Sequence, residues 1–454
     1  MRNVRRIDEA PPQAWLLRLR NGQLSGVAGT AVKGGRDWLF EGGWAFTDTP
    51  RSLSLSGVYL GSGAVWDGRR LSLIAPSHSA DAVYVLERSG ELFASNSLAF
   101  LMAGAGISDF PITLVRKPLL SLKSGLKAYD RCIYSGPEGI VYRFFNAIVR
   151  YEGRAGLKER QQKADVRFER FEEYRDYLLS AIRKASESYG SSGTAVFVSR
   201  GYDSAACAAL AKALGGPCTA ICVDLSRFGD PDDGTEVAKA LGLPTVLLER
   251  RHREKLPRDR SAQEFVRPAE YPDLFEFYIG MTLADECLRA PADLLAGRTV
   301  LTGFHGDKIW DRGAQASPDL VRGDSTGASL GEFRLRIGFL HVPVPMLGFR
   351  AHKKLRAISR SSQMEPWTLH NNYDRPIARR MAEEAGVPRH LFGQRKRATA
   401  TLAANLGEAA PHLFRMLLAR YEPAARHLDV RPRSRFLSAW SALVDRVAAR
   451  SEAA

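Results

Sequence analysis

The fold class is decided by residues 194–216, which read TAVFVSRGYDSAACAALAKALGG. The apolar run 194–198 is typical of a short buried strand, and the run from Ala205 to Leu214 is typical of a helix that ends at a glycine pair. A tight polar turn around Gly201 lies between them. This stretch therefore predicts a strand, a tight loop and a helix in direct succession.

The same alternation continues along the chain. Residues 219–225 and 245–248 predict two more strands, with a helix at 235–241 between them, and residues 298–303 predict a strand that runs into a polar loop. Alternating strands and helices indicate an α/β fold with a parallel sheet and crossover helices on both faces.

The first 110 or so residues differ in composition from the α/β part, because they are rich in Gly, Ser and aromatic residues. Short alternating runs such as 53–56 and 82–86 are separated by turn residues, which predicts a β-rich domain. Charged residues crowd 156–175, where we predict a linker that passes into an amphipathic helix. We therefore expect one domain over residues 1–160 and a second over 161–454, which ends in a basic helical region.

Composition sets further bounds on the chain. It has 454 residues with a net charge of +15, and residues 351–454 hold 19 Lys or Arg against 9 Asp or Glu, an excess of +10. A basic region attracts nucleic acid, acidic lipid or a nucleotide, but no block of Lys and Arg with interleaved aromatics is present.

The five cysteines include no CxxC pair, and no run approaches the roughly 20 apolar residues of a membrane span. We expect a cytoplasmic location.

The loop at residues 199–204, Ser-Arg-Gly-Tyr-Asp-Ser, carries the strongest chemical signal. A helix start after a tight turn favours anions, because its backbone N–H groups point outward, and Ser199 and Ser204 add hydroxyl donors. Asp203 suits a site for phosphates only if a cation such as Mg²⁺ lies between them. The simpler alternative is that Asp203 or Ser204 caps the helix.

A second loop at residues 302–310, Thr-Gly-Phe-His-Gly-Asp-Lys-Ile-Trp, has the same strand-then-loop form. The carboxyl ends of parallel strands face one crevice, so both loops can reach one ligand. Asp203 and Asp307 are then placed to share a metal, although Asp307 is also explained as an ordinary loop carboxylate.

Residues from about 166 to 410 resemble the synthetase domain of asparagine synthetase and its β-lactam synthetase relatives. Residues 199–204 are similar to the family's Ser-Gly-Gly-x-Asp-Ser loop, and residues 302–308 to its Ser-Gly-x-Gly-x-Asp-Glu loop. The segment from Tyr373-Asp374-Arg375 to Gly393-Gln394-Arg395-Lys396 resembles the part where an acidic residue and Arg precede a helix and an essential Lys. The resemblance implies a PP-loop ATP pyrophosphatase fold of the adenine nucleotide alpha hydrolase-like type.

The resemblance also implies an ATP-dependent, AMP-forming ligase or amidotransferase. A substrate carboxylate would attack the α-phosphate of ATP, pyrophosphate would leave, and ammonia or an amine would then displace AMP. Asp203 and Asp307 would position Mg²⁺, and Lys396 would be the catalytic cation near the α-phosphate. The implied nucleotide-binding residues are Ser199, Arg200, Gly201, Asp203, Ser204, Gly303 and Gly306.

Two positions depart from the family pattern. Arg200 stands where the family has its first Gly, so a guanidinium projects at the phosphate loop, where it adds a phosphate contact or fills the site. Lys308 replaces the family's Glu and reverses a charge beside the proposed metal.

The N-terminal region resembles the same family at residues 81–96, which are similar to the strand pair near the end of its glutaminase domain. This implies a layered Ntn-hydrolase-like domain. Such glutaminases need an N-terminal Cys as nucleophile, whereas this chain begins with Met1 and has its first cysteine at Cys132. We therefore expect a degenerate domain that does not hydrolyse glutamine.

Some roles stay open at this stage. His305 is a phosphate contact, a proton-transfer group or a polar filler. Glu332 is either a general base for the attacking amine or part of an exposed element with alternating charges. The sequence favours ATP and a small-molecule or peptide carboxylate as partners over nucleic acid. Two further functions remain, an RNA-modifying enzyme of the same nucleotide-binding fold and a catalytically inactive nucleotide-binding protein.

Overall fold

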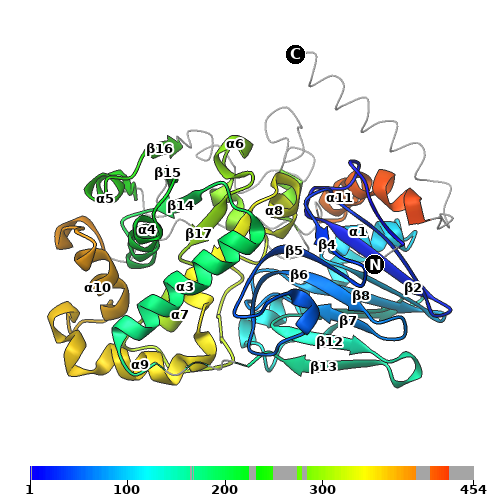
Figure 1. The fold of residues 1–454 in the computed structure, drawn as a ribbon, viewed down its shortest axis with the longest axis horizontal. Coiled ribbons are helices and arrows are strands. Elements are labelled where there is room, and N and C mark those ends of the chain that lie inside the picture. The colour runs from blue at the N-terminus through cyan, green and yellow to red at the C-terminus, as the bar shows by residue number, and fades with distance from the viewer. Residues whose placement is uncertain are drawn as a thin grey trace, which may run out of the picture.

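The computed structural model describes residues 1, 3–163, 166, 168–223, 232–248, 274–278, 284–394 and 410–428 (Figure 1). The chain forms a β-rich N-terminal domain and a parallel sheet flanked by helices. None of the helices in these residues is long and apolar enough to cross a bilayer.

The N-terminal domain contains two sheets. The seven-stranded sheet has the order β1-β3-β2-β9-β8-β11-β10 and the six-stranded sheet the order β13-β12-β7-β6-β5-β4. The strands of the first are β1 (Val4–Arg6), β2 (Trp15–Arg20), β3 (Gln23–Ala28), β8 (Val83–Arg88), β9 (Glu91–Ser95), β10 (Cys132–Gly136) and β11 (Gly139–Phe144). Those of the second are β4 (Lys33–Gly34), β5 (Trp38–Ala45), β6 (Val58–Trp66), β7 (Leu71–Ile74), β12 (Ala147–Tyr151) and β13 (Leu157–Gln161).

One apolar cluster joins the two sheets. It contains Trp15 and Leu17 of β2 together with Leu71 and Leu73 of β7, all completely buried. Alternate residues of each strand point to this shared face, as the period of two in a strand requires. The expected layered β-rich domain is therefore present.

The predicted hairpin at 81–96 is confirmed, because β8 and β9 pair antiparallel around Ser89 and Gly90, both of which have positive φ. The expected strand at 53–56 is wrong. Leu53 has a left-handed φ of 52°, and Ser54 Oγ accepts a hydrogen bond from Gly57 N at 3.2 Å. Serine side chains that bond the nearby backbone in this way favour a turn over a strand.

A third sheet, outside the N-terminal domain, is parallel throughout, in the order β16-β15-β14-β17-β18. Its strands are β14 (Thr194–Val198), β15 (Cys218–Val223), β16 (Thr245–Leu248), β17 (Thr299–Thr302) and β18 (Leu340–Pro343). The helices of this part are α3 (Phe171–Tyr189), α4 (Tyr202–Leu214), α5 (Thr235–Ala240), α6 (Ala292–Leu295), α7 (Gly306–Ile309), α8 (Gly331–Ile337), α9 (His352–Arg360) and α10 (Pro376–Glu384). The predicted strand–loop–helix at 194–216 is confirmed, with α4 beginning at Tyr202.

The two parts are tightly joined. Helix α3 lies along β5 so closely that a Cβ on Gly43 would meet the carbonyl oxygen of Ala185 at 2.1 Å.

Residues 157–161, predicted as part of a linker, form the edge strand β13, whose charged side chains suit an edge. Helix α11 (Ala410–Ala425) returns to the N-terminal part, where it packs beside α1 (Leu98–Gly104) and near α2 (Ile112–Leu120) (Figure 1). The division at residues 160 and 161 stays a prediction.

Candidate functional site

The two loops singled out from the sequence lie at one edge of the parallel sheet. Strands β14 and β17 are direct neighbours, with Val196 opposite Leu301. Because the strands are parallel, residues 199–201 and 303–305 both follow the carboxyl ends and emerge on the same side. The structure therefore brings the two loops together.

The two loops fit against each other at Asp203, in the first turn of α4. A Cβ on Gly303 would lie 2.7 Å from Asp203 Cβ, and a Cβ on Gly306 would lie 2.1 Å from Asp203 Cγ. Neither position has room for a side chain while Asp203 keeps its place. Both glycines are therefore explained by the close approach of the second loop to this carboxylate.

The first loop is closed by its two serines. Ser199 Oγ and Ser204 Oγ lie 2.9 Å apart, Ser199 N donates to Ser204 Oγ at 3.1 Å, and Gly201 N donates to Ser199 Oγ at 3.2 Å. Gly201 is the N-cap of α4, and it has no side chain with which to cap this helix. The helix start therefore keeps the partial positive charge that attracts an anion.

Arg200 turns toward the segment before α5. Its Nε donates to the carbonyl oxygen of Asp233 at 3.1 Å, and its backbone N donates to Asp232 Oδ1 at 3.2 Å. Gly234 explains how this segment comes so near, because a Cβ there would lie 2.5 Å from the carbonyl carbon of Val198. The exposed guanidinium of Arg200 is thus held at the side of the loop.

Asp203 is a carboxylate whose pKa is strongly raised. Its Oδ2 accepts a hydrogen bond from Arg375 Nη1 at 2.5 Å, whereas its Oδ1 is buried and has no partner among the described residues. Burial raises the pKa of Asp203 to about 6; Arg375 opposes this rise and Asp307 adds to it. A buried acceptor without a partner is costly, so it indicates a place for a ligand or cation.

Asp307 lies in the first turn of α7, where its charge acts on the Asp203 carboxylate. Lys308 Nζ lies 3.3 Å from Asp307 Oδ2, and Asp311 Oδ2 lies 3.9 Å from Arg375 Nε. Three carboxylates and two cations therefore share one small region. Among the described residues no group of three or more His, Cys, Asp or Glu side chains has the arrangement of a complete metal site.

The third predicted segment also reaches the first loop. Tyr202 OH donates to the carbonyl oxygen of Tyr373 at 3.4 Å, and Gly393 N donates to the carbonyl oxygen of Arg200 at 2.8 Å. A Cβ on Gly393 would lie 2.5 Å from the ring of Tyr202. All three segments thus meet around α4, while Lys396 lies outside the described residues.

A cavity of about 300 Å³ lies beside the same segment and is lined by Arg312, Gly313, Arg360, Asn371 and Asp374. Arg312 N donates to the carbonyl oxygen of Asp374 at 2.9 Å, and Asp374 Oδ1 is buried without a partner among the described residues. The sequence interpretation missed the two arginines. One indication in the sequence pointed to Arg312, which follows shortly after the second loop, and none pointed to Arg360.

His305 and Glu332 occupy other environments. Burial lowers the pKa of His305 to about 4, and its Nε2 accepts a hydrogen bond from Arg322 Nε at 3.0 Å, so the ring is neutral. Glu332 is buried, and it accepts hydrogen bonds from Ser97 Oγ at 2.6 Å and Tyr421 OH at 2.5 Å. Its partners belong to the N-terminal part and α11, away from the loop contacts described above.

Comparisons with known proteins add little to this geometry. No family model and no curated protein matches the sequence. Among solved structures, the chain is similar to NMN synthetase from Francisella tularensis, at 11% identity and a TM-score of 0.25 over 59% of this chain and 98% of that one. It is also similar to glutamine phosphoribosylpyrophosphate amidotransferase from B. subtilis complexed with ADP and GMP, at 9% identity and a TM-score of 0.19 over 75% of this chain and 88% of that one. Both TM-scores lie below 0.5, so neither likeness indicates a function for this chain.

Proposed function

We propose that the chain is an ATP-dependent, AMP-forming ligase that adenylates a carboxylate and transfers the acyl group to ammonia or an amine. The observation that carries this proposal is the meeting of three segments at Asp203, namely the loop 199–204, the loop 302–308 and the residues that follow Tyr373. These are the segments in which the sequence resembles asparagine synthetase and β-lactam synthetase.

The finer fold assignment belongs to the same proposal. We assign the parallel sheet to the PP-loop ATP pyrophosphatase type, and the N-terminal domain, over residues 1–160, to a degenerate glutaminase-like domain. The second domain would then span 161–454. In this proposal the amine comes from free ammonia or from a substrate amine, and glutamine is not hydrolysed.

The chain's own groups suit a triphosphate. The uncapped N-terminus of α4 and the hydroxyls of Ser199 and Ser204 would bind the departing pyrophosphate, since each supplies N–H or O–H donors. Arg375 and Lys308 bring positive charge to the same place. Such fixed charges favour the leaving group without reorganisation during the reaction.

The resemblance implies Mg²⁺, and the residues present fit it. Asp203 Oδ1 is a buried carboxylate oxygen without a partner among the described residues, and Asp307 adds a second hard oxygen ligand nearby. Mg²⁺ is commonly held by one or two carboxylates together with substrate phosphates. Bound there, it would neutralise charge on the pyrophosphate oxygens.

In the proposed reaction, a carboxylate oxygen bonds to the α-phosphorus while the bond to the β-phosphate oxygen breaks. The amine then bonds to the acyl carbon, AMP leaves, and the amine loses a proton. The cavity with Arg312 and Arg360 is our proposed place for the carboxylate substrate, because two guanidinium groups attract such a group. The role of Lys396 rests on its sequence position alone.

The test is exchange of labelled pyrophosphate into ATP in the presence of a panel of carboxylates. We expect exchange with one class of carboxylate and its loss in Asp203→Asn, with Asp109→Asn as the matched control because Asp109 is exposed and remote in sequence from the loops. Undiminished exchange in Asp203→Asn would overturn the proposed role of this loop.

One observation favours a second candidate, a catalytically inactive nucleotide-binding protein. Lys308 lies 3.3 Å from Asp307 and competes with a metal for that carboxylate. This candidate predicts ATP binding without AMP formation for every carboxylate tested. Among the described basic residues of the C-terminal part, Arg375, Arg379, Arg380 and Arg389 are already in ion pairs, which weakens the case for RNA.

A further inference from the structure

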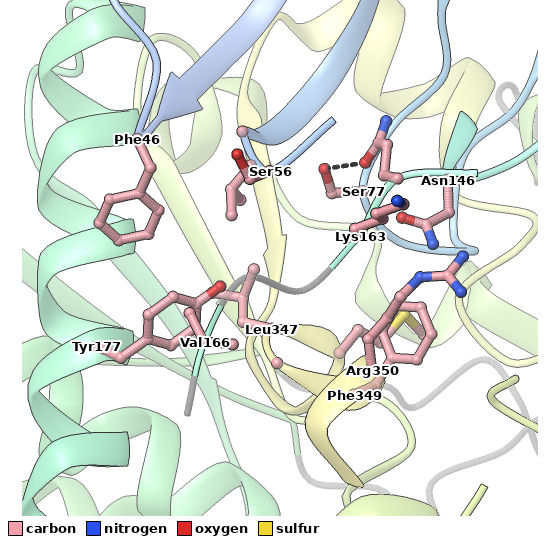
Figure 2. Close-up of a pocket in the computed structure, with 15 residues that line it drawn as sticks. Phe46, Ser56, Ser77, Asn146, Lys163, Val166, Tyr177, Leu347, Phe349 and Arg350 are labelled. Carbon is pink, nitrogen blue, oxygen red and sulfur yellow. Dashed lines mark hydrogen bonds between the residues drawn. The ribbon is translucent and has the colours of Figure 1, made fainter. Parts of the chain in front are cut away.

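A second cavity, separate from the residues of the proposed adenylation site, lies where the N-terminal domain meets the helical part. Its volume is about 280 Å³, just below the range of roughly 300–1,000 Å³ for ligand pockets. Its walls come from the end of β5, the start of β6, helix α3 and the residues that follow β18 (Figure 2). None of the residues that line it belongs to the loops around Asp203.

One end of this cavity is apolar. The rings of Phe46 and Tyr177 stack with centroids 5.3 Å apart and an interplanar angle of 17°. Leu347 lies on the same side of the cavity (Figure 2). Phe46 lines the cavity and is 36% exposed, so part of a large apolar ring remains uncovered there.

The other end is polar and cationic. Arg350 Nη2 donates to Gln161 Oε1 at 2.7 Å, and Asn146, with its amide oxygen turned to the guanidinium, accepts from Arg350 Nε at 2.7 Å. Ser77 Oγ donates to Gln162 Oε1 at 2.5 Å on the same wall, and Figure 2 shows the Lys163 side chain beside them. This wall therefore combines neutral amides with cations.

Arg350 is half-buried, and among the described residues no carboxylate lies within ion-pairing distance of it. Burial lowers the pKa of Arg350; the carboxylates of Asp319 and Glu159 oppose this only through space. A cation removed from water without a counter-charge is costly, and an anion in the cavity would remove that cost.

We propose that this cavity binds an amphipathic monocarboxylate, with its carboxylate on Arg350 and its aromatic or branched apolar tail against Phe46, Tyr177 and Leu347. The described hydrogen bonds of Arg350 use its Nε and Nη2, so its Nη1 is the nitrogen that would donate to the carboxylate. Among the described residues that line the cavity, Arg350 is the one half-buried cation, and Lys163 lies at the rim. This arrangement suits one negative charge better than a phosphate dianion. This proposal does not depend on the adenylation chemistry.

The test is calorimetric titration of the full chain with 3-phenylpropionate, its neutral amide 3-phenylpropionamide and phenyl phosphate. We expect the carboxylate to bind and the amide to bind about 10- to 100-fold more weakly, because the charged hydrogen bonds to Arg350 are lost. Arg350→Gln should weaken carboxylate binding by the same factor, and Arg350→Lys should weaken it less. Arg69→Gln, at an exposed turn, is the matched control and should leave the affinity unchanged.

Four results would overturn the proposal. The first three are equal affinity for the acid and its amide, unchanged carboxylate affinity in Arg350→Gln, and tighter binding of phenyl phosphate than of the carboxylate. The fourth is the absence of binding up to about 10 mM carboxylate. Two controls accompany these titrations of wild type and Arg350→Gln. Titration with ATP shows whether the ATP site is intact, and the melting temperature of each unliganded protein shows whether the fold is intact.

Discussion

The buried carboxylate of Asp203 should cost the unliganded protein stability in a way that depends on pH. Its pKa is about 6 in the folded chain, against an ordinary value of 3.8, because burial disfavours the charged form. Between these two pH values the folded state holds a proton that the unfolded state has released, so stability falls as the pH rises. The full effect is about 3 kcal/mol at 1.36 kcal/mol per pH unit.

The substitution Asp203→Asn removes this titration and nearly preserves the shape of the side chain. The ion pair with Arg375 forms only when Asp203 is ionised, so its effect is already included in the pKa of about 6, and the change from carboxyl to amide adds only a part that does not vary with pH. The difference in unfolding free energy between Asp203→Asn and wild type should therefore grow with pH, by about 1.3 kcal/mol between about pH 5 and about pH 7.

Urea denaturation of both proteins across this pH range measures that growth directly. Asp109→Asn removes an exposed carboxylate instead and should show no comparable trend. A difference between Asp203→Asn and wild type that stays flat from about pH 5 to about pH 7 would refute the reasoning, because it would mean that this carboxylate is not held in a costly environment.

Two further substitutions test the geometry of the loops. Gly306→Ala would place a Cβ 2.1 Å from Asp203 Cγ, so we expect at least a tenfold loss of pyrophosphate exchange with a retained circular dichroism spectrum; near-normal exchange would contradict the close fit. Lys308→Gln removes the cation 3.3 Å from Asp307, so we expect half-maximal exchange at a lower Mg²⁺ concentration, and an unchanged or higher requirement would argue against Asp307 as a metal ligand.

Local patterns predicted the parallel sheet well because its strands are short, buried and bounded by turns. The expected strands at 194–198 and 245–248 have the bounds seen in the structure, and the adjacency of β14 and β17 follows the expected placement of both loops. The failure at 53–56 has a local cause, since alternating Leu and Ser suit both a strand and a serine-bonded turn.

Long-range contacts could not be predicted in the same way. The pair of Asp203 and Arg375 joins residues 172 positions apart, and Tyr421 OH reaches Glu332 across 89 positions. The sequence pattern marked Arg375 only as part of a motif, and nothing local indicated that α11 would return to α1. The cation of the second cavity, Arg350, likewise depends on amides that come from the N-terminal domain.

The most direct measurement of the central claim is the identity of the nucleotide product. ATP labelled at the α-phosphate would be incubated with the protein, Mg²⁺ and a metabolite extract, and the labelled product separated by chromatography. Cleavage at the α-phosphate, as the two loops around Asp203 and Asp307 require, yields AMP and pyrophosphate. Labelled ADP in place of AMP would contradict it.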